Sequence, residues 1–307
     1  MVTLRIYTHE DCLAHTVPEG HPERAARLAF LLQHLEQTGF ASDYPIQVAP
    51  QIENASIVRA HDEGLICRLY EQIPETGLTS VDPDTWVSPQ SMVAARSAAG
   101  AVWQGVQDVT TGEASRVFCA VRPPGHHAES GNPMGFCLLN SVAIAAINAL
   151  TLPEVERVAI LDFDVHHGNG TVEICRSHPE ILVCSSFQYP FYPGRYDDLT
   201  QSNIVNTPLE AGSSGDDFRR AISDSWWKAI ELHRPDIILI SAGFDAHRAD
   251  PLAQLNLDES DFSWITLEIA ALANEFSRGR IVSTLEGGYD LQALADSALV
   301  HLRALAD

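Results

Sequence analysis

The sequence has few basic residues: 19 lysines and arginines stand against 41 aspartates and glutamates, which gives a formal net charge of −22. A field of that sign repels phosphate backbones, so we expect no binding to nucleic acid. It favours the approach of cationic molecules such as polyamines or lysine-rich peptides, although an acidic surface more commonly just keeps a protein soluble. The charge therefore bears on solubility and encounter rate, and it leaves the type of reaction open.

Long apolar runs and paired cysteines are also missing. Because no apolar run reaches about 18 residues, we expect no membrane span. The six cysteines form no CxxC pair and several lie in apolar runs, which indicates free thiols in a reducing compartment. The first residues lack the basic and then apolar pattern of a signal peptide, so we expect a cytoplasmic protein. No interface stripe stands out, and homo-oligomerisation stays open.

Short β-rich segments alternate with longer helical patterns along the chain. Residues 2–7 are predicted as a first strand, and five later runs are almost continuously apolar, as in strands of a parallel sheet that is buried on both faces. Those five runs are Arg116–Val121, Val158–Phe163, Ile181–Ser186, Ile237–Ser241 and Arg280–Leu285. The predicted helices are Pro22–Gln37, Ser88–Asp108, Leu138–Leu150, Gly170–Ser177, Asp216–His233, Asp258–Ser277 and Asp290–Leu305.

This βαβ succession predicts one α/β domain over residues 1–307, with a largely parallel sheet flanked by helices. Two polar stretches, residues 193–208 and 247–257, are predicted as loops. Polar residues also gather where predicted strands end, in the segments Arg122–Gly135, Asp162–Gly170, Gln188–Tyr196, Gly243–Asp250 and Gly287–Tyr289. The carboxyl ends of parallel strands meet at one edge of a sheet, so we expect these segments to form a single site.

The segment LDFDVHHGNGT, residues 161–171, indicates a metal site. With a period of two, Asp164 and His166 point to one face, while Asp162 shares their parity but lies deeper. Capping of the next helix would explain one aspartate, but unpaired burial of several ionisable residues would be costly. Asp245 in SAGFDAH could be the third protein ligand of a catalytic zinc, and two carboxylates would also suit iron(II) or cobalt.

Two further motifs carry groups for acid–base and electrostatic chemistry. In RPPGHHAE, His126 and His127 follow a strand and a rigid Pro-Pro-Gly turn. Two adjacent histidines at such a position, beside a predicted metal site, favour a role in general acid–base catalysis. In LEGGYD, two glycines allow a sharp turn that places Tyr289 over the same edge, where a phenol could donate to a developing oxyanion. A tight turn alone would also explain GGY.

Taken together, these motifs resemble the arginase–deacetylase fold, a three-layer architecture, and specifically the histone deacetylases and their class II-like bacterial amidohydrolase relatives. The resemblance spans nearly the whole chain. The motifs occur in family order as HPERAARL, RPPGHHAE, GFCLLN, LDFDVHHGNGT, SAGFDAH and LEGGY. It implies a single deacetylase domain that hydrolyses acetylated amines such as acetyl-lysine in a peptide or protein.

The resemblance also implies roles for single residues. Asp164, His166 and Asp245 would bind Zn²⁺, with Fe²⁺ as an alternative in the cell. His127 would act as general base with His126 as its electrostatic partner, and Tyr289 would donate to the oxyanion. Asp162 would pair with His126 and Asn169 with His127. Since a neutral partner stabilises imidazolium less, His127 should be more readily neutral.

Further residues would line the substrate tunnel or hold a structural ion. Phe136 and Tyr192 match its aromatic walls, Gly135 a tunnel glycine, Arg24 a channel arginine and Asp84 a rim aspartate. A structural K⁺ is implied near Asp162, Asp164, His166 and Ser185.

Proteins with alternative functions would differ from this chain at a few positions. Relatives that cleave acetylpolyamines place an acid where this chain has Leu252, which favours acetyl-lysine, although Glu75, Asp82 or Asp84 could supply an acid from another loop. Binuclear manganese ureohydrolases need aspartates where this chain has Gly168 and His247. A non-catalytic binding module would have lost a catalytic residue, and none of the predicted ones is missing.

Overall fold

In the computed structural model, which describes residues 2–307, strands with mostly buried side chains pair into one eight-stranded sheet. In spatial order they are β2 (Ile46–Val48), β1 (Leu4–Thr8), β5 (Arg116–Cys119), β10 (Ile281–Leu285), β9 (Ile237–Ala242), β6 (Val158–Asp162), β7 (Ile181–Gln188) and β8 (Ile204–Leu209). Every neighbouring pair is parallel. Because the central strands are covered on both faces, their sequences are almost continuously apolar.

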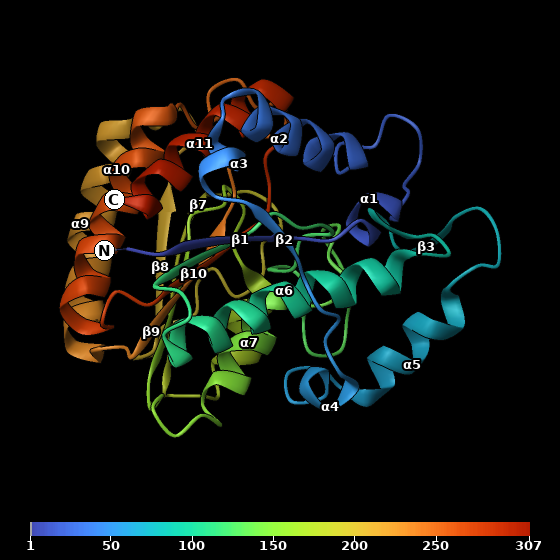
Figure 1. Ribbon diagram of the computed structural model, residues 1–307, viewed down its shortest axis with the longest axis horizontal. Coiled ribbons are helices and arrows are strands. Elements are labelled where there is room, and N and C mark those ends of the chain that lie inside the picture. The colour runs from blue at the N-terminus through green and yellow to red at the C-terminus, as the bar shows by residue number, and fades with distance from the viewer. Residues whose placement is uncertain (1) are drawn as a thin grey trace.

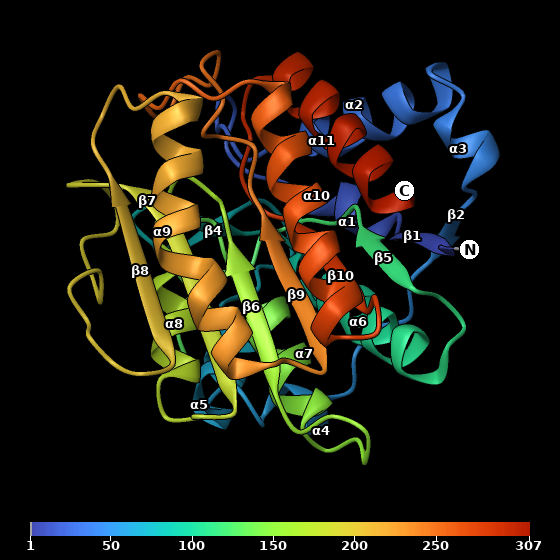
Figure 2. The same cartoon turned by 90° about the vertical axis from the view of Figure 1, so that its left-hand side faces the viewer.

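Helices form a layer on each face of this sheet. Figure 2 shows α9 (Gly215–His233), α10 (Glu259–Phe276) and α11 (Leu291–Ala306) in front of the strands, with α6 (Ser91–Thr111) and α7 (Ser141–Ala149) behind them. The remaining helices are α1 (Asp11–Ala14), α2 (Ala25–Gln37), α3 (Phe40–Asp43), α4 (Asn54–Ile57), α5 (Glu63–Gln72) and α8 (Asn169–Cys175). One cluster of buried apolar side chains runs through all three layers.

The order of the strands decides where the site forms. The strands β5, β10, β9 and β6 lie side by side in the sheet although they are far apart in the sequence. Because all four run in the same direction, the loops that follow them leave from one edge. A small antiparallel hairpin, β3 (Thr79–Asp82) and β4 (Thr85–Val87), lies outside the large sheet. Figure 1 shows that the two chain ends lie close together, away from that hairpin.

The predicted parallel α/β architecture is confirmed, and each predicted strand and helix lies within three residues of its expected ends. The segment 247–257 is a loop as predicted, and the six cysteines are free, five of them buried. The prediction of a loop over residues 193–208 is wrong at its end, since β8 begins at Ile204. Pro208 concealed this strand: proline is tolerated only at a sheet edge, and β8 is an edge strand. Within residues 2–307, no helix combines the length and apolarity that a membrane crossing requires.

Candidate active site

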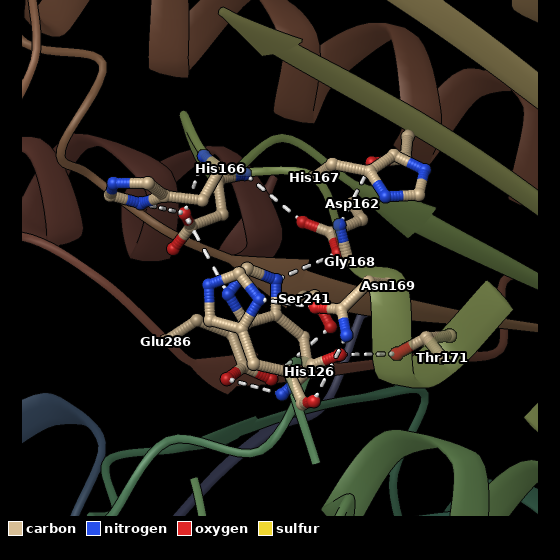
Figure 3. A network of polar contacts seen from close by, with 12 residues as sticks. His126, Asp162, His166, His167, Gly168, Asn169, Thr171, Ser241 and Glu286 are labelled. Atoms are coloured by element: carbon tan, nitrogen blue, oxygen red, sulfur yellow. Dashed lines mark hydrogen bonds and ion pairs between the residues drawn. The ribbon is translucent and has the colours of Figure 1, made fainter. Parts of the chain in front are cut away.

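Four adjacent strands deliver the polar residues of the site to the same edge of the sheet. The loop after β5 carries His126 and His127, and β6 ends at Asp162 and continues to Asp164 and His166. Asp245 follows β9, and the turn with Tyr289 follows β10. Figure 3 shows His126, from the loop after β5, close to Asp162, His166 and Asn169, which lie between the end of β6 and the start of α8. The predicted catalytic and metal-binding residues are therefore brought together in space.

Asp164, His166 and Asp245 form a buried cluster whose possible ligand atoms all lie within 4.8 Å of one another. The Nδ1 atom of His166 lies 3.1 Å from Oδ1 of Asp164 and 3.1 Å from Oδ2 of Asp245. Burial alone would lower the pKa of His166, but the hydrogen bonds to these two carboxylates raise it to about 10. A cluster that stabilises positive charge so strongly, with two carboxylates and one imidazole converging, suits a divalent cation.

Two glycines leave room for this cluster. A Cβ atom on Gly243 would lie 2.1 Å from Oδ2 of Asp164, and one on Gly287 would lie 2.0 Å from Oδ2 of Asp245. The backbone also holds the carboxylates in place. The N–H of Gly287 donates to Oδ2 of Asp164 at 2.8 Å, and the N–H of Val165 donates to Oδ1 of Asp245 at 2.9 Å. Gly287 of LEGGYD therefore makes room for the two carboxylates and binds one of them, in addition to its part in the turn.

The two histidines have different partners. Nδ1 of His126 lies 3.0 Å from Oδ2 of Asp162, and Nδ1 of His127 lies 2.7 Å from Oδ1 of Asn169. Their rings pack with centroids 4.0 Å apart. Both predicted pairs are present in the structure, one with a carboxylate and one with an amide.

Their electrostatic environments differ accordingly. Burial lowers the pKa of His126, but the carboxylates of Asp164 and Asp162 outweigh it and raise that pKa well above its usual value. The pKa of His127 lies well below its usual value, because burial and the nearby His126 and His166 all disfavour its charged form. A neutral His127 beside a cationic His126 is able to accept a proton.

A pocket of about 100 Å³ opens onto these groups. Its lining residues are Asp84, His127, Gly135, Phe136, His166, Tyr192, Leu252 and Tyr289. Gly135 is required beside His127, because a Cβ atom there would lie 2.4 Å from the imidazole ring. Oδ1 of Asp84 accepts a 3.1 Å hydrogen bond from the N–H of Gly135, which ties the β3–β4 turn to the pocket wall. All predicted tunnel residues except Arg24 line this pocket.

The prediction for Arg24 is not matched by its position. Arg24 is the exposed residue just before α2, and it lines a different surface depression with residues 15–20. Arg27 reaches the site instead: its guanidinium lies 4.8 Å from the centroid of the Tyr289 ring and donates to the carbonyls of Glu286 and Gly288. The predicted start of the helix at Pro22 is three residues early, because α2 begins at Ala25. Arg24 is therefore the N-cap residue, and Arg27 lies on the buried face of the helix.

The sequence interpretation did not identify Glu286 as a residue of the site. Glu286 is buried, and its Oε2 accepts from the N–H groups of Gly125 and His126 at 2.6 and 3.2 Å (Figure 3). Its Oε1 accepts from the Ser241 hydroxyl at 3.2 Å. Glu286 directly follows the apolar strand β10 in the motif LEGGYD, and a charged residue at that position was the available signal. Ser185 on β7 is paired with Asp162 on β6 in the register of the sheet.

Comparisons with known proteins show what the chain is similar to. The family model described as histone deacetylase domain matches residues 21–305. The chain is 40% identical over 306 residues to an uncharacterized protein of Synechocystis sp., and the match covers 98% of both chains. It is 33% identical to a probable deacetylase of Archaeoglobus fulgidus, covering 100% of this chain and 87% of the relative. The crystal structure of the HDA15 HD domain matches with a TM-score of 0.93 and 31% identity, covering 99% of this chain and 88% of that one.

Proposed function

The chain belongs to the histone deacetylase family, and we propose that this deacetylase hydrolyses the side-chain amide of acetyl-lysine in a peptide or protein, with residues 1–307 acting as one catalytic domain. The observation that carries the proposal is the convergence of three possible metal ligands, the His126–His127 pair and Tyr289 at one pocket. Neither nucleic acid nor a membrane is part of this proposal.

Asp164, His166 and Asp245 would hold Zn²⁺, with Fe²⁺ as an alternative, and Asp162 and Ser185 would contribute to a structural K⁺ site with the neighbouring Asp164 and His166. When bound, the catalytic cation would polarise the acetyl carbonyl and make water a stronger nucleophile. The donor set supports this, because two buried carboxylates and one imidazole leave coordination positions free for water and substrate.

The remaining steps belong to side chains of the pocket. His127 would take a proton from the attacking water and later deliver it to the departing lysine amine. Positive charge on His126, held by Asp162, would stabilise the negative charge that develops beside it. The Tyr289 hydroxyl would donate to the carbonyl oxygen as that oxygen gains negative charge. The products would be acetate and a free amine.

The pocket supports a narrow unbranched substrate chain. Phe136 and Tyr192 would contact the methylene groups of the lysine chain, and Gly135 lines the same pocket. Asp84 would accept from a backbone N–H of the peptide at the rim. Leu252 lines the same pocket and offers no charge to a distant ammonium group.

An acetylated polyamine is the second candidate, because acids do lie near the mouth. Burial and the neighbouring Asp84 raise the pKa of Asp82, so two carboxylates lie close together there. The test compares kcat/KM of the zinc-loaded protein on an acetyl-lysine peptide and on acetylputrescine, with Asp82→Asn as the matched variant. A higher value on the peptide supports the proposal. A higher value on acetylputrescine that Asp82→Asn removes would replace it by the polyamine function.

A further inference from the structure

We propose that Glu129 is a positioning residue of this reaction: it fixes the amide of Asn169 and so determines which ring nitrogen of His127 carries the proton. The inference rests on the proposed role of His127 as a base. It concerns a buried carboxylate that touches neither the pocket nor the predicted metal ligands.

The three side chains form a continuous hydrogen-bonded chain. Oδ1 of Asn169 lies 2.7 Å from Nδ1 of His127, and Nδ2 of Asn169 donates to Oε1 of Glu129 at 2.9 Å. All three residues are buried, and Glu129 is 3% exposed. Water therefore has little access to replace either contact, and the two ends of the amide must be satisfied by protein groups.

Only one orientation of the amide satisfies both neighbours. A carboxylate accepts hydrogen bonds and cannot donate them, so it selects the NH₂ end of Asn169. The carbonyl end then faces His127, and it can only accept. In the reversed orientation the amide oxygen would lie against the Glu129 carboxylate, and two acceptors would meet in a buried place.

The orientation of the Asn169 amide determines which ring nitrogen of His127 carries the proton. Because Oδ1 of Asn169 accepts, Nδ1 of His127 must carry the proton of the neutral ring. Nε2 then keeps its lone pair. Since the Nδ1 end is held by Asn169 while the ring lines the pocket, Nε2 is the atom left to take a proton from water. Glu129 thereby controls the tautomer of the base through a neutral intermediary.

Glu129 is itself anchored from the other side. Its Oε2 lies 3.1 Å from Nη2 of Arg195, whose side chain is 45% exposed. The Asn169 amide has two weaker neighbours, the carbonyl of His127 and Sδ of Met134, each 3.4 Å from Nδ2. Neither is charged, so the carboxylate is the dominant acceptor for this amide.

The neighbouring contact between Ser130 and Glu173 provides a matched control. Glu173 accepts from the N–H and the hydroxyl of Ser130 at 2.9 and 3.2 Å, so it also ties this loop to α8. It makes no hydrogen bond to Asn169. Glu173→Ala therefore loosens the same junction without touching the amide.

The test measures kcat and KM of the zinc-loaded protein on an acetyl-lysine peptide, together with ¹⁵N NMR of its imidazole nitrogens. We expect Glu129→Ala to lower kcat by about 10- to 100-fold with little change in KM or zinc content, and to convert the His127 spectrum from the Nδ1–H tautomer to a mixture. Glu173→Ala should leave both readouts near wild type. Equal losses in the two variants, or an unchanged tautomer in Glu129→Ala, would overturn the inference.

A double variant that exchanges the acid and the amide of the Glu129–Asn169 pair provides an independent test. N169D places a carboxylate against Glu129 and should lower kcat. The double variant N169D/E129Q should recover part of that loss, because glutamine donates where glutamate could only accept. No recovery over N169D would contradict the donor and acceptor roles assigned here. An inactive wild-type protein would refute the proposed function, whereas the NMR comparison would still decide the role of Glu129.

Discussion

The backbone N–H of Tyr289 donates a 2.7 Å hydrogen bond to Oδ2 of Asp250, a buried side chain on a different loop. The other oxygen of Asp250 accepts from the N–H of Leu252 at 2.9 Å. The Asp250 carboxylate thus fixes two elements of the pocket: the turn that carries Tyr289, the proposed oxyanion donor, and Leu252 at the pocket mouth. The 247–257 loop therefore helps to position Tyr289.

Removal of this carboxylate should displace Tyr289. We expect Asp250→Ala to lower kcat about 10- to 100-fold, since small displacements of a catalytic group carry costs of this size. In a Tyr289→Phe background the same change should have little further effect, because the phenol it positions is already gone. Asp290→Asn, which weakens only the cap of α11, is the control and should leave kcat near wild type. Additive losses of Asp250→Ala and Tyr289→Phe would contradict this coupling.

The metal ligands can be tested without any substrate. Asp164→Ala should lose stoichiometric zinc, because the variant retains only one carboxylate and His166 in the cluster. Asp296→Asn removes an aspartate that is 37% exposed and should keep full zinc content. Metal analysis of the dialysed proteins decides the matter, and full zinc retention in Asp164→Ala would mean that the ligands are assigned wrongly.

A buried ion pair behind the site should make stability depend on pH. Burial alone would raise the pKa of Glu23, but Arg122 and Arg27 outweigh it and hold that pKa at about 2, below its usual value of 4.5. Glu23 and Arg122 form two parallel contacts of 2.7 Å. The contribution of Glu23 to the free energy of unfolding is then present above pH 4.5 and is lost as the pH falls towards 2, on the order of 3 kcal/mol.

Urea unfolding of the wild type and Glu23→Gln at several pH values measures this contribution. The free-energy difference between the two proteins should be constant from pH 7 to about 5 and should shrink below pH 4.5. A difference that stays constant down to pH 3 would show that Glu23 does not titrate as described.

Most of the architecture could be predicted from the sequence because the buried parallel strands leave an unmistakable pattern. The runs that begin at Val158 and Ile237 are almost continuously apolar and buried at every position, a pattern typical of strands covered on both faces. The β3–β4 hairpin could not be predicted because its strands are short and partly polar, and the edge strand β8 could not be predicted because Pro208 interrupts its pattern. Pairing with neighbours, rather than their own sequence, makes them strands.

The same distinction applies to the residues of the site. Residues that recur with fixed spacing in a motif, such as Asp164 and His166, could be assigned from the sequence. Contacts between distant segments could not be read from spacing, since Asp250 and Tyr289 or Arg27 and Gly288 meet only through the fold. Glu129 lay within a quoted motif, yet its role depends on a hydrogen bond to Asn169, which lies 40 positions further along the chain.

The most direct test of the account is acetate release from an acetyl-lysine peptide by the zinc-loaded protein, compared with His127→Ala. We expect the wild type to release acetate and free lysine amine in equal amounts, and His127→Ala to be slower by about 10²- to 10⁴-fold, because a general base contributes that much. Wild-type acetate release no faster than that of His127→Ala would contradict the central claim that this pocket deacetylates lysine with His127 as its base.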